Sequence, residues 1–315
     1  MKTPVAGIQA EASGSSPERT AQPKKIHPVL IYPFSQPGDY SDLEALYQMV
    51  ARLNADPQTY ARPITVMDRK THHSMRGNKA FFEFRKERIA PHSDILDAWC
   101  VDTCQMWYSG LGFAFEKGSA EDVYWLIPGD FNYGSAVGRE ILERLHHIPE
   151  VVSEVGADVS IGEITADDGH SKQLIDTYGT FALLYNWFPN ETQEIRGYTG
   201  RPRSEFFAVR HSFLREVLQQ RWYAYEQTVV ILLQAAMSNR RISRFIIGEL
   251  SDLPAGRESL SSAVQQVERT ERVLKSMWLE RNQSKPGWSD QYCALAHQSD
   301  IVRRTALIVL ERALK

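Results

Sequence analysis

A continuous apolar run, Val123 to Pro128, is followed at once by the turn residues Gly129 and Asp130. Strands that face water on one side alternate apolar and polar residues, so an unbroken run rich in branched and aromatic side chains indicates a strand covered on both faces. Such strands are typical of α/β sheets with helices on both sides. Ligands of these sheets bind just beyond the carboxyl ends of the strands, where this pattern places Asp130.

Length and composition narrow the class of protein. The 315 residues suffice for one large α/β domain with an appendage. The net charge of −3, without a long Lys/Arg run, argues against a dedicated nucleic-acid binder. No stretch of about 18 apolar residues occurs, so no integral membrane segment is expected. Residues 1–25 are polar and have no apolar signal-peptide core, which predicts a disordered leader and a cytoplasmic protein.

Hydrophobic periodicity predicts strands and helices in alternation along most of the chain. The expected strands are 27–34, 62–68, 122–128, 158–163, a short one within 204–211, and 241–248. The expected helices are 42–53, 94–115, 137–145, 172–187, 212–222, 226–237, 259–282 and 298–314. This order builds a mostly parallel sheet flanked by helices.

The last part of the chain differs in character from the rest. Residues 259–282 form a charged amphipathic pattern, and 298–314 repeats it after the turn at Lys285-Pro-Gly-Trp. We therefore predict a catalytic α/β domain over 26–250 and a helical appendage over 251–315. An antiparallel pair of amphipathic helices packs on the core or on a second copy of the chain, so a homo-oligomer through these helices is expected.

The order of elements resembles GT-A glycosyltransferases of the family 2 type, particularly enzymes like dolichyl-phosphate mannosyltransferase and glucosyl-phosphoglycerate synthase. The resemblance covers 26–250. It rests on a strand ending in Asp68, a helix with the small residues Ser109-Gly-Leu-Gly, and the strand with the acidic turn at Asp130. It implies a GT-A (Rossmann-like) fold and transfer of a hexose from a nucleoside diphosphate sugar, a UDP- or GDP-hexose, to an acceptor.

The resemblance also implies which residues bind the nucleotide. A carboxylate at the end of the second strand would accept a hydrogen bond from a ring N–H of the base, and the alternative for this aspartate is a capping or turn role. Basic residues after that strand would face the phosphates, and a solvated loop is the alternative. The nucleotide-binding candidates are Pro33, Phe34, Ser35, Asp68, Arg76, Lys79 and Gly129.

The family's Asp-x-Asp motif, which holds the metal, is incomplete in this sequence. In one register Pro128-Gly-Asp130 matches it, and in the other Asp130-Phe-Asn132 does, so Asp130 is retained in both. Carboxylate and amide oxygens suit Mg²⁺ or Mn²⁺, which would bridge the two phosphates. The predicted metal ligands are Asp130 and Asn132, with His211 as a substitute for the missing carboxylate. An unliganded Pro-Gly-Asp turn is the alternative.

On the acceptor side, the resemblance points to Arg203 and Ser204, with Glu226 as the group that orients the acceptor or removes its proton. An arginine can bind a phosphate or carboxylate through two N–H groups, which favours a small or lipid-linked acidic acceptor. The alternatives are a surface arginine and a helix-capping Glu226. With the metal site, the predicted catalytic residues are Asp130, Glu226 and Arg203.

Two other functions remain open from the sequence. A sugar nucleotidyltransferase would share the fold, but it would need a Gly-rich phosphate loop after the first strand, and Phe34-Ser-Gln-Pro-Gly does not supply one. A non-catalytic GT-A-like binding or scaffold protein is suggested by the incomplete acidic motif and by the helical tail. The sequence leaves open the donor sugar and base, the acceptor and the stereochemical outcome.

Overall fold

The computed structural model describes residues 25–31, 41–68, 76–98, 103–166, 173–220, 227–249 and 260–313. Its centre is a seven-stranded sheet in the order β3-β2-β1-β4-β6-β5-β7. The strands are β1 Ile26–Ile31, β2 Ile64–Asp68, β3 Asp94–Ala98, β4 Val123–Pro128, β5 Val159–Ala166, β6 Phe207–Arg210 and β7 Ile242–Glu249. The predicted leader, residues 1–25, lies outside the described residues except for Lys25.

Strand direction defines one functional edge of the sheet. β1 pairs in parallel with β2 and β4, β2 with β3, and β5 with β7. Only β6 among the strands of this sheet is antiparallel, and it lies between β4 and β5. The carboxyl ends of the six parallel strands therefore share one edge with the amino end of β6.

Strand β4 is covered on both faces, as its sequence predicts. Its six residues are buried, and alternate side chains enter two different cores. Tyr124 and Leu126 pack with the helix at 103–117. Val123, Trp125 and Ile127 pack on the other face with the helices at 41–55, 136–142 and 147–154. The confirmed strand thus contributes side chains to both cores.

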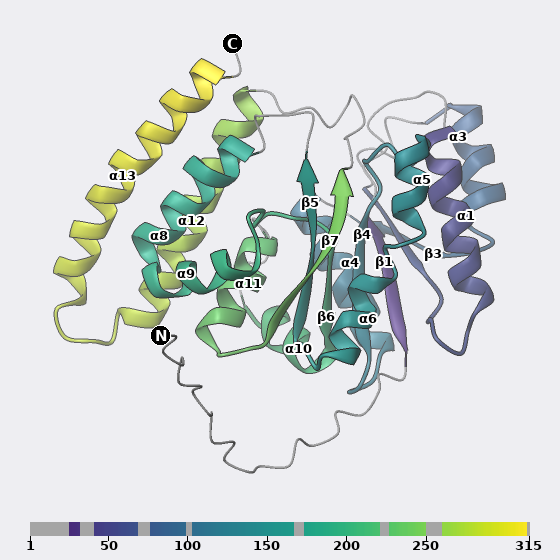
Figure 1. Ribbon diagram of the computed structural model, residues 1–315, viewed down its shortest axis with the longest axis horizontal. Coiled ribbons are helices and arrows are strands. Elements are labelled where there is room, and N and C mark those ends of the chain that lie inside the picture. Colours follow the sequence, from purple (N-terminus) through teal and green to yellow (C-terminus); the bar gives the residue numbers. More distant parts are fainter. Residues whose placement is uncertain are drawn as a thin grey trace, which may run out of the picture.

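Helices cover both faces of the sheet (Figure 1). They are α1 Ser41–Ala55, α3 Lys79–Phe84, α4 Thr103–Lys117, α5 Ala136–Leu142, α6 His147–Glu154, α8 Ala182–Trp187, α9 Pro189–Tyr198, α10 His211–Leu218, α11 Gln227–Met237, α12 Leu260–Asn282 and α13 Trp288–Ala313, with π-helices η1 Arg85–Ile89 and η2 Ile175–Phe181. Among the described helices, none combines the length and the apolar character that a membrane span requires.

Glycine allows α4 to approach the sheet closely, as expected from its small residues. A Cβ on Gly110 would lie 2.6 Å from a methyl of Val66 on β2 and 2.7 Å from a methyl of Val29 on β1. These distances are shorter than a carbon–carbon contact allows. Gly110 therefore sets the spacing between this helix and the first two strands.

The C-terminal helices α12 and α13 form a long antiparallel pair beside η2 and α8, with α13 outermost (Figure 1). A buried polar network ties them to α8. The Trp187 indole N–H donates to Ser299 Oγ over 3.0 Å, Ser299 donates to Glu271 Oε1 over 2.7 Å, and Arg303 Nε lies 3.1 Å from Glu271 Oε2. The division into domains at residue 250 stays a prediction.

Several local predictions are wrong. Residues 94–115 were expected to form one helix, but Asp94–Ala98 is the edge strand β3. The helix was predicted because Leu96, Trp99 and Cys100 follow one another at roughly helical spacing. In the structure Asp94 at the start of the strand pairs instead with Arg62 and Lys117. The last helix begins at Trp288, ten residues before the predicted start at 298. Helices α3, α6 and α9 were not predicted at all.

A cluster of titratable side chains lies at the amino edge of the sheet, where β1 and β4 begin. His27 Nε2 donates to Asp122 Oδ2 over 2.8 Å, and the His27 ring stacks on Tyr124 at 4.9 Å between centroids. Tyr124 in turn hydrogen-bonds His211 Nδ1 at 2.7 Å, and His211 stacks on Phe115. Burial lowers the pKa of His27 more than Asp122 raises it, and burial also lowers the pKa of His211.

This cluster predicts a loss of stability on acidification. A histidine whose pKa is lower in the folded state binds its proton better in the unfolded chain, so stability falls as the pH drops below the ordinary value of 6.5. Burial alone would raise the pKa of Asp122, but hydrogen bonds from His27 and Ser119 outweigh it and hold that pKa below 3.8, which gives the same sign at lower pH. We expect the melting temperature to fall by several degrees between about pH 7.5 and pH 5.5.

The test is the pH dependence of thermal unfolding in wild type and in His27→Gln, whose amide can still donate to Asp122. The variant should lose part of the slope across this range. Equal slopes in the two proteins would show that His27 does not titrate with unfolding.

Candidate functional site

The strand order places the topological switch point of the sheet between β1 and β4. β2 and β3 follow β1 on one side, and β4 with the later strands lies on the other, so the direction of the order reverses at this pair. Such switch points are where α/β sheets bind ligands. The Gly129 N–H donates to the Ile31 carbonyl over 2.8 Å, which joins the two strand ends. The candidates Pro33, Phe34 and Ser35 follow β1 and lie outside the described residues.

Asp130 follows β4 at this switch point and is partly buried. Beneath it the fully buried Tyr133 donates its hydroxyl to the Pro128 carbonyl over 2.7 Å. Burial, then the carboxylates of Asp130 and Glu205, raises the pKa of Tyr133 well above its ordinary value. Both carboxylates therefore act on one hydroxyl. Carboxylate oxygens are the hard ligands that Mg²⁺ and Mn²⁺ prefer, so Asp130 and Glu205 are groups at this edge whose chemistry suits a divalent ion.

Glu205 was missed by sequence reasoning. It directly precedes the buried Phe206 at the amino end of β6, and because β6 is antiparallel this end lies at the carboxyl edge of β4. The alternation of Ser204-Glu-Phe-Phe could have marked Glu205 as a strand-end residue. The antiparallel direction of β6 is what places Glu205 near Asp130, and the sequence does not reveal this direction.

Asn132 has a structural role at the start of α5. Its side-chain oxygen accepts from the Ser135 N–H over 3.1 Å, and Ser135 Oγ accepts from the Gly138 N–H over 2.9 Å. Two successive caps of this kind fix the turn that leads into the helix. The oxygen predicted to bind metal therefore accepts one hydrogen bond in this turn, and its role as a metal ligand stays a prediction.

The prediction of His211 as a metal ligand is wrong. His211 begins α10 directly after β6, and its N–H donates to the Asp122 carbonyl at the amino end of β4. Asp130 lies beyond the other end of that six-residue strand. At about 3.3 Å per residue the two positions are roughly 20 Å apart. His211 belongs to the amino-edge cluster and cannot share an ion with Asp130.

The predicted acceptor residues, Arg203 and Ser204, lie a few residues before β6 at the carboxyl edge of the parallel strands. Arg203 forms an ion pair there with a buried aspartate. Arg201 Nε and Arg203 Nε each lie 2.7 Å from a different oxygen of Asp176, whose side chain is 2% exposed. Arg203 also donates to Gln266 of α12, and Ser204 donates to the Gly162 carbonyl of β5. The segment before β6 is thereby fixed between the sheet and the C-terminal helices.

The remaining predicted residues are less enclosed or outside the described parts. Asp68 ends β2 at the same edge as β1 and β4. Arg76 is exposed, and Lys79 begins α3 with a side chain 88% exposed and 3.5 Å from Glu83 of the same helix. Glu226 precedes α11 and lies outside the described residues.

Comparison with solved structures identifies the fold. Glucosyl-3-phosphoglycerate synthase from Mycobacterium tuberculosis, in complex with Mn²⁺, UDP and phosphoglyceric acid, superposes with a TM-score of 0.54 at 12% identity over 81% of this chain and 78% of that chain. The chain has the GT-A fold. Mannosyl-3-phosphoglycerate synthase from Rubrobacter xylanophilus gives a TM-score of 0.52 at 11% identity over 83% and 76% of the two chains.

At these identities the similarity of this GT-A chain to the two synthases establishes the fold alone. No protein-family model matches the sequence, and no curated protein gives a significant sequence match. The expectation of a GT-A fold from the sequence is confirmed. The activity has to be argued from the residues at the carboxyl edge.

Proposed function

We propose that this protein is a glycosyltransferase that moves a hexose from a nucleoside diphosphate sugar to an acceptor with the help of a divalent metal ion. The observation that carries the proposal is the position of Asp130 at the switch point, with Glu205 beside the same buried tyrosine. The fold supports it, because similar structures hold UDP with Mn²⁺ or Mg²⁺.

In this proposal Asp130, with Glu205 as a second carboxylate, holds Mg²⁺ or Mn²⁺ at the donor diphosphate. A divalent ion held there would supply positive charge to the leaving diphosphate. Asp68 and the Pro33-Phe-Ser segment bind the nucleoside from the ends of β2 and β1, and Gly129 lets the donor approach the strand end closely. Arg76 and Lys79, which are exposed and follow β2 in the chain, attract the anionic donor by their positive charge.

The acceptor side is proposed at the segment before β6. Arg203 and Ser204 line it, and Glu226 orients the acceptor or accepts its proton. The two arginines bound to Asp176 carry a net positive charge, which favours a small or lipid-linked acidic acceptor. In support, one similar structure binds phosphoglyceric acid.

The experiment that tests the function is calorimetric titration of the protein with UDP and with GDP, with and without Mn²⁺. Metal-dependent binding of one nucleotide supports the transferase and identifies the base. Binding of neither nucleotide under any metal condition would contradict it and favour the non-catalytic scaffold. Product analysis with a sugar nucleotide distinguishes transfer from nucleotidyl transfer. The cytoplasmic location stays a prediction from the sequence.

We also propose that the protein forms a homo-oligomer through α13. Ile301 and Ile308 lie two turns apart on this outer helix and are 54% and 53% exposed. Apolar residues at this spacing form the seam of paired helices. Light scattering should give a mass above that of one chain, and Ile308→Asp should give the monomer. A monomeric wild type at high concentration would contradict the proposal.

A further inference from the structure

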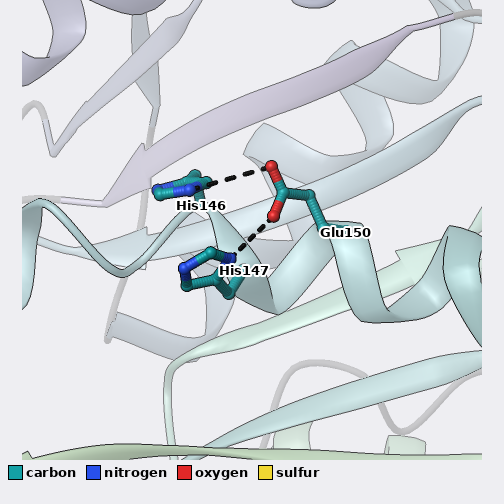
Figure 2. Close-up of side chains that lie close together, drawn as sticks. All are labelled: His146, His147 and Glu150. Atoms are coloured by element: carbon teal, nitrogen blue, oxygen red, sulfur yellow. Dashed lines mark hydrogen bonds and ion pairs between the residues drawn. The ribbon is translucent and has the colours of Figure 1, made fainter.

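Three metal-ligating side chains converge on the surface at the start of α6 (Figure 2). His146 Nε2 lies 3.8 Å from Glu150 Oε1, and His147 Nδ1 lies 2.7 Å from Glu150 Oε2. One potential ligand atom from each residue falls within 4.8 Å of the other two. Among the residues that the structure describes, this is the one group of three histidine, cysteine or carboxylate side chains whose potential ligand atoms lie this close together.

The local fold positions these side chains. His146 is the residue before the helix, at φ −62° and ψ −21°, and His147 is its first residue. Glu150 comes one helical turn later, so its carboxylate lies between the two rings. Leu145 and Ile148 are fully buried on either side of the histidine pair, which holds the backbone beneath the cluster.

The surroundings restrict the histidine rings further. The two rings lie 4.0 Å apart between centroids, and the His147 ring contacts Phe245 of β7 at 5.4 Å. The Arg144 guanidinium lies over the Phe245 ring and donates a hydrogen bond to the Ile246 carbonyl over 3.2 Å. Both contacts of this nearby cation are therefore made with β7. Glu150 also acts electrostatically on the half-buried Tyr60.

We propose that His146, His147 and Glu150 form a zinc-type metal site with a fourth position open to water. Two imidazoles and one carboxylate are a ligand set found in three-residue zinc sites. Zinc–nitrogen and zinc–oxygen bonds near 2.0 Å at tetrahedral angles separate ligand atoms by about 3.3 Å. The two histidine nitrogens lie 3.8 and 2.7 Å from the two different oxygens of Glu150, so zinc binding requires rotation of these side chains toward one common spacing.

This site is separate from the metal of the proposed transferase and does not depend on it. The cluster packs on Phe245, which pairs with Gly162 halfway along the edge strand β7, four residues before this strand ends at Glu249. Imidazole nitrogen favours zinc, whereas the oxygen ligands around Asp130 favour Mg²⁺ or Mn²⁺. The two sites therefore differ in both place and chemistry.

Binding of the ion moves a hydrogen within the His147 ring. Because an ionised carboxylate only accepts, the His147 Nδ1 that lies 2.7 Å from Glu150 carries a hydrogen. For Nδ1 to donate its lone pair to the metal, this hydrogen has to shift to Nε2 of the same ring. A neutral imidazole therefore binds zinc without net release of a proton to the buffer.

The test uses tag-free protein in an Asp130→Asn background, which removes competition from the proposed transferase metal. Calorimetry with ZnCl₂ in two buffers of different ionisation enthalpy measures stoichiometry and proton release, and Co²⁺ absorption reports the geometry. We expect one equivalent of zinc and tetrahedral cobalt bands. His147→Ala and Glu150→Gln should each weaken zinc binding by at least about tenfold.

The matched control is His297→Ala, which removes an exposed histidine from α13 and should leave the zinc affinity unchanged. Melting temperature should rise with zinc in the background protein and in the control, but not in His147→Ala. Equal zinc affinity in the background protein and in His147→Ala, or octahedral cobalt bands without a change in melting temperature, would overturn the proposal. These outcomes leave the nucleotide titration unaffected, so the two proposals fail separately.

Discussion

Replacement of Asp130 by asparagine should reduce sugar transfer by at least about 100-fold and abolish the effect of Mn²⁺ on nucleotide binding. The amide keeps the size of the carboxylate but removes the charge that holds a divalent ion at the switch point. The effect should appear mainly in kcat with a UDP- or GDP-sugar, because neutralisation of the leaving diphosphate matters most in the transition state.

Asn132→Ala is the matched control for this loss. The Asn132 side-chain oxygen accepts from the Ser135 N–H, so its removal should lower the free energy of unfolding by about 1 kcal/mol and leave metal dependence in place. Comparable loss of metal dependence in the two variants would contradict the assignment of Asp130 as the ligand of this segment. Full activity of Asp130→Asn would contradict the proposed mechanism.

Asp176→Ala should lower the free energy of unfolding by about 3 kcal/mol, because it removes a buried carboxylate from an ion pair and leaves its partners uncompensated. The substitution leaves Arg201 and Arg203 without the carboxylate that each contacts at 2.7 Å, in a site where their side chains are only 15% and 12% exposed. Urea unfolding followed by tryptophan fluorescence measures the change. Binding of an acidic acceptor should weaken as well, because the two arginines lose their fixed orientation.

The control for the buried aspartate is Asp300→Ala. Asp300 is bound by two arginines as well, Arg303 and Arg304, but its side chain is 36% exposed, whereas that of Asp176 is 2% exposed. Surface ion pairs contribute little, so the unfolding midpoint should barely move. Equal shifts in the two variants would show that burial of Asp176 adds nothing to its effect.

Much of the sheet could be predicted from periodicity, because buried parallel strands have a distinctive pattern. The continuous apolar run of β4 predicts burial on both faces, and the structure divides its side chains between two cores. β3 was mistaken for a helix because it is an edge strand whose Asp94 and Asp97 meet arginine and lysine side chains. At an edge, ion pairs replace the apolar alternation on which such a prediction depends.

The candidate site was predictable only where it depends on position along one strand. Asp130 follows β4 in any α/β arrangement, so its place at the ligand edge did not require the structure. His211 was placed wrongly because a sequence does not reveal that β6 runs antiparallel, and this reversal puts Glu205 at the functional edge and His211 at the opposite one. The pairing of Arg203 with Asp176 spans 27 residues and has no local signature.

The hydrogen bond between Trp187 and Ser299 has a consequence for biosynthesis. The two residues are 112 positions apart in the sequence. Side chains of α13 also belong to the same hydrophobic core as those of β1, the first strand of the chain. At roughly 5–20 residues per second, a ribosome needs about 6–20 s to add the intervening chain. During that interval the apolar side of α8 has no cover from α13, so the nascent protein should bind chaperones most strongly after α8 emerges and release them once α13 has been made.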